Sequence, residues 1–425
     1  MKRMTRREFL KRASAGVALF SIVPGHVLGG RGRTPPSETV TRAVIGTGGM
    51  GMSHVEPNTK DAPLRTLAVC DVDKDHLANG LKKAGPGCQG YSDFRRVLER
   101  KDIDTIHVPT PPHWHALVSI AAMQAGKDVM CEKPLTRFIH EGRVVVETAA
   151  RYGRILQVNS YGRGEYVKLR KLVASGLLGH PLTVRAYKRF GCNFKVKEWS
   201  GRTDLKPEPV PSALDYDMWL GPAPVKPYHP HRVHQSFRCY WDYDGGGLAD
   251  MGQHWLDPIQ YFLGKDDTGP VEVEAEGPWP PHPDATGMWG RVTLKYADGT
   301  KLILESEEWG APEPGNPPFI EGPKGKVLER DSTETDPPGL FEQSESFPVL
   351  PREQSFEEAV KSRDNSNISK PNAAEAQRSS TIFHLANIAI RTGRKIHWDP
   401  VAERIIGDEG ANRFVNQPMR APWHL

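Results

Sequence analysis

The sequence lacks paired cysteines and long apolar runs. Its five cysteines form no Cys-x-x-Cys pair, which excludes the usual spacing of a zinc site and of a redox dithiol. The number is odd, so at least one is unpaired within the chain. The sequence selects no disulfide, and we interpret all five as buried small hydrophobic residues. They are Cys70, Cys88, Cys131, Cys192 and Cys239. Beyond the N-terminus no run of about 18 apolar residues occurs, so we expect no membrane span there.

The sequence also lacks a large charge of one sign. The formal net charge is +4, from 56 Lys and Arg against 52 Asp and Glu. Residues 1–30 carry a charge of about +5, so the rest of the chain carries about −1. A near-neutral chain has no charge-based attraction to nucleic acid or anionic membranes, and we expect neither as a partner. With 38% hydrophobic and 25% charged residues, the composition is typical of a soluble globular protein of two or three domains.

The N-terminal stretch TRREFLKRASAGVALFSIV, residues 5–23, has the pattern of an export signal. The pair Arg6-Arg7, followed by FLK at 9–11, matches the twin-arginine motif that directs folded proteins across a membrane. The apolar run after it has about 11 residues, which suits a signal peptide and is too short to span a bilayer. We therefore predict a twin-arginine signal peptide over residues 1–35 and a periplasmic or otherwise exported protein.

A glycine-rich turn follows the first strand-like run. Residues 43–45 are apolar, and Gly46-x-Gly48-x-x-Gly51 comes directly after them. Gly46 permits a tight turn, Gly48 lets the backbone approach a diphosphate, and Gly51 lets a helix pack close to the strand. A second apolar run ends at Asp71, where a carboxylate accepts hydrogen bonds from a ribose and repels a 2′-phosphate. This combination predicts NAD, rather than NADP, as the cofactor.

Strand and helix patterns continue to alternate after this turn. We predict strands at 102–111, 128–136 and 154–163, separated by helices at 115–127 and 140–153. Such alternation favours a doubly wound parallel sheet. The second half differs, because strand-like patterns at 182–190, 271–277 and 290–307 are separated by longer stretches. The last contains Asp298-Gly299, a hairpin turn signal, and the Pro- and Gly-rich stretch 308–352 predicts long loops. No internal repeat is visible.

Three short motifs together resemble the Gfo/Idh/MocA family of sugar and inositol oxidoreductases. They are the glycine turn with Gly49, the run Thr110-Pro111-Pro112-His113-x-His115, and Glu132-Lys133-Pro134. The resemblance continues through GGGLADMGQHWLDP at 245–258 and through 384–400, which looks like a subgroup of exported bacterial members. It implies an NAD-binding Rossmann domain over 40–160. Over 161–425 it implies a substrate-binding and oligomerisation α/β domain with a large open, mostly antiparallel sheet. A homo-oligomer, dimer or tetramer, is expected from pairing of such sheets.

The resemblance also implies a catalytic centre. Lys133 follows a predicted strand end, where open α/β sheets bind ligands, and the family lysine at this place lies between substrate and nicotinamide. Asp250 and His254 are four residues apart, which places both on one face of a helix. We assign His254 as the general base and acid on a sugar hydroxyl, since histidine titrates near neutrality. Asp250 is its partner or a substrate contact.

Binding residues are assigned partly from the glycine turn and partly from the resemblance. To the cofactor we assign Gly46, Thr47, Gly48, Gly49, Met50, Gly51, Asp71, Thr110, Pro111, His115, Glu132 and Lys133. To the substrate we assign Tyr161, Arg163, Asp250 and His254. For His115 a structural role at the start of a helix is the alternative. His229, His231 and His234 fit no standard metal spacing, so we predict sugar contacts there and no metal.

Three functions remain open on this basis. The first is an NAD-dependent oxidoreductase acting on a sugar or glycoside hydroxyl, at C3, with tightly bound and internally recycled NAD. The second is a redox-neutral glycoside hydrolase that oxidises C3 transiently, eliminates the aglycone, adds water and reduces the ketone again. The third is a sugar-binding protein with an inactive site. We favour the first. Free NAD is not expected in the cell envelope, so folding around NAD before export would explain a twin-arginine signal.

Overall fold

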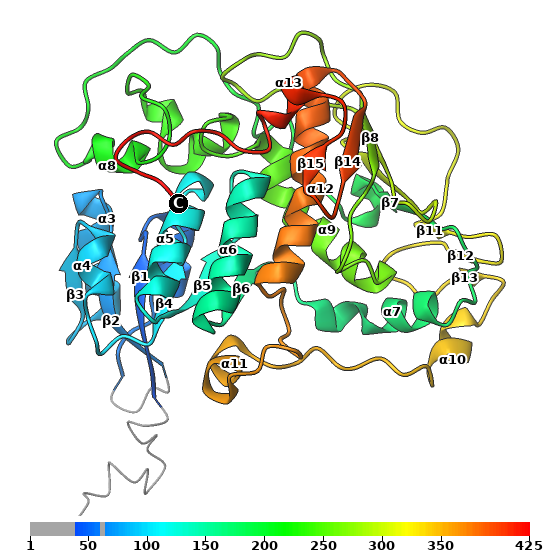
Figure 1. The fold of residues 1–425 in the computed structure, drawn as a ribbon, viewed down its shortest axis with the longest axis horizontal. Helices are drawn as coiled ribbons and strands as arrows, with labels where there is room; N and C mark the ends of the chain where they lie inside the picture. The colour runs from blue at the N-terminus through cyan, green and yellow to red at the C-terminus, as the bar shows by residue number, and fades with distance from the viewer. Residues whose placement is uncertain (1–38, 60–63) are drawn as a thin grey trace, which may run out of the picture.

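The computed structural model describes residues 39–59 and 64–425. The predicted signal peptide, residues 1–35, lies outside the described residues. The chain forms two sheets with helices between and around them (Figure 1). None of the helices within the described ranges is long and apolar enough to cross a membrane.

The first sheet has six parallel strands in the order β3-β2-β1-β4-β5-β6, which makes it the doubly wound parallel sheet that we predicted. Its strands are β1 (Val40–Ile45), β2 (Leu64–Cys70), β3 (Gln89–Tyr91), β4 (Thr105–Val108), β5 (Asp128–Glu132) and β6 (Leu156–Asn159). The accompanying helices are α2 (Gly49–His54), α3 (Lys74–Ala84), α4 (Phe94–Leu98), α5 (Pro112–Gln124) and α6 (Ile139–Tyr152). Helix α5 begins three residues before its predicted start, since a proline at the first helical position needs no backbone N–H.

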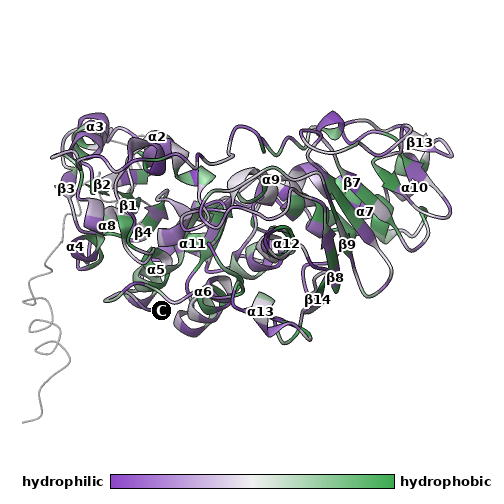
Figure 2. Ribbon diagram, turned by 90° about the horizontal axis from the view of Figure 1, so that it is seen from above, coloured by the Kyte–Doolittle hydropathy of each residue, from purple (hydrophilic) through white to green (hydrophobic). Residues whose placement is uncertain are grey.

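Burial explains why the central strands of this sheet are hydrophobic and its outer helix is hydrophilic. Strand β4 is buried at all four positions, as expected for a central parallel strand covered by helices on both faces. Outer helix α3 is largely hydrophilic, whereas the central strands β1 and β4 are hydrophobic (Figure 2). The carboxylate of Asp73 caps the start of α3 by accepting from the amides of Asp75 and His76. The helix therefore begins directly beside the carboxyl end of β2.

The second sheet has nine strands in the order β13-β12-β11-β7-β10-β9-β8-β14-β15. The strands are β7 (Thr183–Ala186), β8 (Glu272–Ala275), β9 (Arg291–Lys295), β10 (Lys301–Glu305), β11 (Ile320–Glu321), β12 (Lys326–Val327), β13 (Thr335–Asp336), β14 (Ile396–Asp399) and β15 (Arg404–Ile405). Only β7 and β10 pair in parallel among the described strands of this sheet, so it is large, open and mostly antiparallel as predicted. The stretch 308–352 is not only loop, because it contributes β11, β12, β13 and the short helix α10 (Leu340–Ser344).

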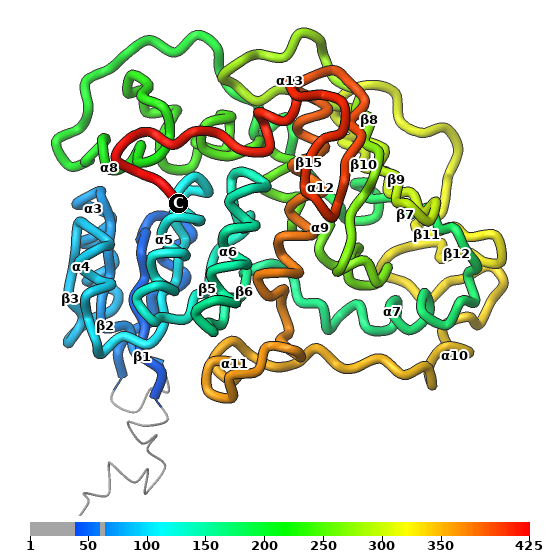
Figure 3. Tube along the Cα trace, in the orientation of Figure 1, coloured from blue at the N-terminus to red at the C-terminus, as the bar shows by residue number. Residues whose placement is uncertain are grey.

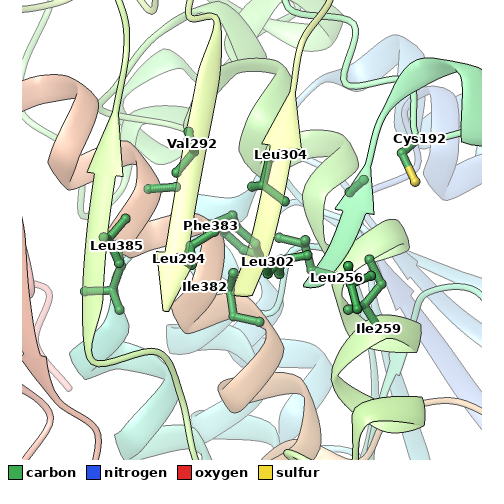
Figure 4. Close-up of a cluster of buried hydrophobic side chains, with 14 of the residues drawn as sticks. Cys192, Leu256, Ile259, Val292, Leu294, Leu302, Leu304, Ile382, Phe383 and Leu385 are labelled. Carbon is green, nitrogen blue, oxygen red and sulfur yellow. The ribbon is translucent and has the colours of Figure 1, made fainter. Parts of the chain in front are cut away.

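Two long helices cover one face of this sheet. Helices α9 (Gly246–Leu263) and α12 (Ala373–Thr392) pack against each other, and their apolar side chains meet those of β9 and β10 (Figure 4). Leu256, Leu294, Leu302 and Phe383 are fully buried in this core. Helix α12 also contacts α6 of the first domain. The start of α9 is thereby held close to the carboxyl edge of the parallel sheet.

A segment of the second half crosses over to the first domain. Residues 212–238, here called the cap, include the short helix α8 (Tyr216–Leu220) and run next to α3 and α5 (Figure 3). Leu214 of the cap forms a bridge with Asp73. The C-terminal tail ends beside α5 and α8 (Figure 3), where the guanidinium of Arg420 donates to the carbonyl of Gly221 (2.8 Å).

Candidate active site

One cavity of about 690 Å³ lies where the first sheet, the start of α9 and the cap meet. The glycine turn lies at its wall together with Asp71, and Lys133, Asp250 and His254 line it as well. Residues predicted for the cofactor and for the chemistry therefore share one space. A binding site at the carboxyl edge of a parallel sheet is the usual position in this type of fold.

The glycine turn is held too tightly for side chains. Gly46 has a φ of +98°, and its amide donates to the carbonyl of Cys70 (2.7 Å). A Cβ on Gly51 would lie 2.0 Å from the carbonyl oxygen of Gly46, so no other residue fits there. Gly46, Gly48, Gly49 and Met50 line the cavity, whereas Thr47 and Gly51 do not. Gly51 thus serves packing, as its place in the motif predicts.

Asp71 lies directly after β2 and is fixed by the turn. Its carboxylate accepts from the amide of Thr47 (2.6 Å) and from the amide of Asp73 (2.9 Å). Burial raises the pKa of this carboxyl, and the two hydrogen bonds oppose that shift. Asp71 lines the cavity, at the position from which the sequence predicts contact with a ribose.

The residues present fit an NAD molecule. Gly49 has open space where a Cβ would stand, and the hydroxyl of Thr110 is buried in the cavity wall without a hydrogen-bond partner. The wall near Asp71 includes apolar and aromatic side chains, among them Phe94 and Trp114. A glycine turn suits a diphosphate, a carboxylate suits a ribose and an apolar wall suits an adenine.

Glu132 and Lys133 stand at the end of β5, and both line the cavity. The carboxylate of Glu132 lies 2.8 Å from Nε2 of His54 and accepts from Nδ2 of the Asn159 side chain (2.6 Å). Burial alone would raise the pKa of Glu132, but these two partners outweigh it and hold the pKa below its usual value. The loop after β5 is thus anchored by a charged, hydrogen-bonded carboxylate.

Asp250 joins the two domains through its carboxylate. Nζ of Lys133 donates to Oδ1 of Asp250 (2.7 Å) and to its backbone carbonyl (2.8 Å), and Nε of Arg238 donates to the same Oδ1 (2.7 Å). Burial opposes ionisation here, yet the two cations keep the pKa of Asp250 below its usual value. Burial and the charge of Asp250 together raise the pKa of the neighbouring Asp244.

His254 lies one turn further along α9, as its spacing predicts. Its ring stacks on Tyr161 with centroids 4.2 Å apart, and its Nδ1 lies 3.4 Å from Oγ of Ser160. Burial, followed by the charge of Lys133, lowers the pKa of His254 to about 4. The imidazole is therefore neutral at pH 7 and able to accept a proton.

Gly247 brings the start of α9 to this place. A Cβ on Gly247 would lie 2.1 Å from the carbonyl oxygen of Phe194, so the helix approaches the neighbouring backbone as closely as glycine allows. The glycine run before Asp250 thus has a positional role.

The prediction that Arg163 binds substrate is wrong. Its side chain is fully buried and donates to Asp257 (2.7 Å) and Asp266 (3.0 Å), and it pairs with Glu375 at 3.1 Å. Three acidic partners occupy the guanidinium, and it does not line the cavity. Arg163 therefore holds the fold together.

Two further predicted residues do not line the cavity. The ring nitrogens of His115 each lie 2.7 Å from a backbone carbonyl, those of Pro134 and Thr110. His115 does not line the cavity, so it positions two loops that do, which corresponds to the structural alternative. Tyr161 also stands outside the lining and contacts the site through its stack on His254. Thr110 and Pro111 line the cavity.

The three histidines at 229, 231 and 234 do not form one group, because His229 and His231 lie together and His234 lies elsewhere. His231 lies 2.8 Å from the hydroxyl of Tyr240 and donates its amide to His229. His234 instead approaches Asp73 (3.6 Å) and His76. Asp73, His76 and His234 offer potential metal-ligand atoms within 4.8 Å of one another. Of the three loop histidines only His234 lines the cavity, and the absence of a metal stays a prediction.

Several residues of the site were not predicted from the sequence. Arg238 shares the carboxylate of Asp250, and His54 and Asn159 share that of Glu132. No spacing connects them to their partners, which lie 12, 78 and 27 positions away. Met218 and Trp219 of the cap also line the cavity.

Fold and site together define a class: an NAD-binding protein whose Rossmann domain and α/β domain share one cavity. The chain belongs to the Gfo/Idh/MocA oxidoreductase family. The family model for the NAD-binding Rossmann fold matches residues 40–160, and the model for the C-terminal alpha/beta domain matches residues 164–425. The resemblance seen in the sequence and the prediction of NAD are thereby confirmed. The twin-arginine subgroup stays a prediction.

Curated relatives fall into two functional groups. Inositol 2-dehydrogenase of Salmonella paratyphi B is 30% identical over 152 residues, which cover 34% of this chain and 45% of the relative. A glycosyl hydrolase family 109 protein of Solibacter usitatus is 34% identical over 197 residues, 42% of this chain and 44% of the relative. An alpha-N-acetylgalactosaminidase of Shewanella oneidensis is 31% identical over 181 residues, 40% of this chain and 39% of the relative. The chain spans less than half the length of each of these relatives.

Solved structures share the fold over nearly their whole length. The WlbA dehydrogenase of Bordetella pertussis, in complex with NADH and UDP-GlcNAcA, has a TM-score of 0.56 at 16% identity, covering 85% of this chain and 99% of that chain. The aldose-aldose oxidoreductase of Caulobacter crescentus, complexed with glycerol, has a TM-score of 0.51 at 16% identity, covering 84% and 99%. At these identities the likeness shows the fold alone.

Proposed function

We propose that this protein oxidises a sugar or glycoside hydroxyl, at C3, with an NAD that stays bound and is recycled in place. The observation that carries the proposal is the meeting of Lys133, Asp250 and His254 in the cavity that also holds the glycine turn. The inositol 2-dehydrogenase relative supports a polyol-type substrate.

Each of the three residues has a role that follows from its surroundings. Bound NAD supplies a two-electron hydride acceptor. His254, which is neutral, takes the proton of the reacting hydroxyl, while the C–H hydrogen leaves as hydride. The ammonium of Lys133, aimed by Asp250, donates to the reacting oxygen and stabilises the negative charge that develops on it. The reverse path returns the proton from His254.

The proposed export requires a closed redox cycle. We propose that residues 1–35 direct the folded, NAD-loaded protein out of the cytoplasm. An NADH that stays bound has to be reoxidised in place. A second carbonyl substrate or an external acceptor then takes the electrons. A dimer or tetramer is part of the same proposal.

Glycosides deuterated at C3 test the reaction directly. The protein, purified without added nucleotide, is mixed with the labelled glycoside and a carbonyl acceptor. We expect a 3-keto product in equal amount to the reduced acceptor, with the deuterium found in the reduced acceptor. A keto product that still carries the deuterium at C3 would reject the C3 assignment, because its carbonyl would then lie at another carbon.

A second candidate is the redox-neutral glycoside hydrolase. The glycosyl hydrolase family 109 and alpha-N-acetylgalactosaminidase relatives favour it. Transient oxidation at C3 acidifies the C–H at C2, so elimination and readdition of water would introduce solvent hydrogen there. Release of an aryl group without added cofactor or acceptor, with deuterium from D₂O at C2, would identify this activity. Sugar binding without either turnover, unchanged in Lys133→Ala and His254→Ala, would instead indicate an inactive binding protein.

A further inference from the structure

The cap is joined to the first domain directly after Asp71. The amide of Lys74 donates to the carbonyl of Ala213 (3.0 Å), and the amide of Asp215 donates to the carbonyl of Val72 (3.0 Å). Nζ of Lys74 also donates to the carbonyl of Ser212 (3.2 Å). These bonds pair a strand-like piece of the cap with the residues that follow β2. The cap therefore lies against the end of the cavity where Asp71 stands.

A second attachment holds the other side of the cap. The carbonyl of Trp219 lies 3.0 Å from Nε2 of His113 and accepts from Nε1 of Trp114 (3.1 Å), both at the start of α5. The C-terminal tail braces the same place, because the ring of Trp423 packs edge-on against Trp114 with centroids 4.8 Å apart. The cap is thus fixed to the loops after both β2 and β4.

A third contact comes from the far end of the cap. Nε2 of His234 lies 3.6 Å from the carboxylate of Asp73, and its ring lies 4.7 Å from that of His76. His234 lines the cavity together with His76 and Asp71. The space beside Asp71 is therefore bordered by the first domain on one side and by two separate parts of the cap on the other.

Apolar side chains from both sides line this end of the cavity. Phe94 and Trp114 come from the first domain, and Met218 and Trp219 come from the cap. Met218 also packs against the hydrophobic core of the first domain. Flat aromatic walls of this kind suit a purine ring.

We propose that the cap closes over the adenosine half of NAD and retains it. Phe94 and Trp114 of the first domain and Met218 and Trp219 of the cap would together form the wall around the adenine ring. NAD leaves only when the bonds of Lys74 and Asp215 to the cap open. The inference rests on the proposed function, because retention has a purpose only for a cofactor that is recycled in place.

The exchange rate of bound NAD tests the cap. The full-length holoprotein is incubated with excess isotopically labelled NAD. At successive times the bound nucleotide is released by denaturation, and mass spectrometry gives the labelled fraction. We expect exchange over hours in the native protein and at least about tenfold faster exchange in Met218→Ser. Val225→Ser is the matched control, since Val225 lies in the same cap but is 70% exposed and does not line the cavity.

Hydrogen exchange at the amides of Lys74 and Asp215 provides an independent readout. Both amides bond across the contact between the cap and the first domain, and NAD leaves only after these bonds open, so we expect the bonds to open at least as often as NAD leaves. His234→Ala serves as a second variant, because its side chain is 42% exposed and its removal leaves the core intact. We expect His234→Ala to accelerate both the exchange of bound NAD and the hydrogen exchange at the two amides.

The results of these experiments distinguish a failure of the cap proposal from a failure of the proposed function. Equal NAD exchange in the native protein, Met218→Ser and His234→Ala, with folding preserved, would overturn the cap. Turnover by a protein whose NAD exchanges within seconds would overturn both the cap and the retained NAD, and would leave in place only the oxidation of a sugar hydroxyl. A protein that holds no NAD and binds none would overturn the cap and the proposed function.

Discussion

Two cationic side chains share one carboxylate oxygen of Asp250, and this geometry determines the direction of the Lys133 side chain. Oδ1 accepts from both Lys133 and Arg238, so the ammonium of Lys133 is fixed in direction. Ordering a long, flexible lysine side chain costs side-chain entropy, and the hydrogen bonds to Asp250 compensate for that cost. Asp250 therefore acts on the reaction through the position of Lys133.

Replacing Asp250 by asparagine tests this positioning at constant size. Without the carboxylate, the buried ammonium of Lys133 loses its partner, and we expect kcat to fall about 100- to 1000-fold. The NAD content should stay at about one per chain, because Asp250 lies on α9 and not on the glycine turn. Steady-state kinetics and nucleotide analysis of the same sample measure both quantities.

Asp267→Asn is the control for this change. Asp267 is exposed and lies after the end of α9, so the same loss of charge should leave kcat unchanged. A similar loss of kcat in both variants would mean that overall charge, and not the position of Lys133, determines the rate.

The acid limb of the pH–rate profile reports on His254. Burial and Lys133 lower the pKa of His254 to about 4, so the neutral base persists as pH falls and is lost only when protonation occurs near that value. We expect kcat/KM to decline near pH 4, well below the ordinary histidine value of about 6.5.

The variant Lys133→Met provides the comparison. Removing the positive charge relieves its depression of the pKa of His254, so the acid limb of the residual activity should move to higher pH. An acid limb that stays in place would show that Lys133 has no influence on the ionisation of His254.

Sequence alone predicts the residues that belong to local patterns. Lys133 follows a strand end, and the spacing of Asp250 and His254 fits one helix face, so all three could be named before the structure. Arg238 could not, because its link to Asp250 depends on how a loop folds back onto a helix. Arg163 was misassigned since its partners Asp257, Asp266 and Glu375 are distant in sequence and make it a buried structural residue.

At the scale of elements, Arg163 connects three helical segments. It lies in the short 3-10 helix η2 (Arg163–Tyr166) and pairs with Asp257 of α9 and Glu375 of α12. Glu375 in turn pairs with Arg352 (2.7 Å). The network fixes the join between the two domains to the helices that cover the second sheet.

Arg163→Ala should destabilise the protein strongly. Asp257 is buried and would lose its cation, and breaking a buried pair in this way costs about 3–5 kcal/mol. Denaturant unfolding of the holoprotein measures the change. Arg202→Ala is the control, because its pair with Asp204 is exposed and its loss should not shift the midpoint. An unchanged midpoint for Arg163→Ala would show that the network adds nothing to stability.

Element prediction succeeds where a pattern is long enough. The alternation within 40–160 and the Asp298-Gly299 turn between β9 and β10 predicted the elements that they cover, and Gly299 has the expected positive φ of 87°. No element was predicted for α3, β3 and α4, which lie between Asp71 and residue 102. Strands β11, β12 and β13 have two residues each, which is too short for a period of two to show. They form only because the edge of β7 offers unpaired backbone groups.

At the scale of the whole molecule, the position of the cap against the first domain could not be foreseen. The contacts of the cap with Asp73 and α5, made by Leu214 and Trp219, join residues more than 100 positions apart. The expected dimer or tetramer also stays a prediction. Pairing of two subunits through the second sheet would use the face opposite to the buried one. The strand residues on that face are largely polar, including Glu274, Thr293, Lys295 and Lys301. Light scattering of the purified protein would give the number of subunits.

The proposed export belongs to this scale, because it concerns the folded, loaded chain. Replacing Arg6 and Arg7 by lysine keeps the charge but removes the motif read by the folded-protein route. We expect the double variant to accumulate in the cytoplasm with about one NAD per chain, the same content as the exported native protein. Cell fractionation followed by nucleotide analysis of each fraction measures both.

The matched control replaces Lys2 and Arg3 by glutamine, which removes more charge but leaves the motif intact, so export should continue. Normal export of the Arg6→Lys, Arg7→Lys variant would reject the twin-arginine assignment. A cytoplasmic pool without NAD would reject loading before export, even if the motif is required. Because the cap closes over the same cofactor, a loaded cytoplasmic pool should also show slow NAD exchange, which would connect export of a folded protein to retention of its cofactor.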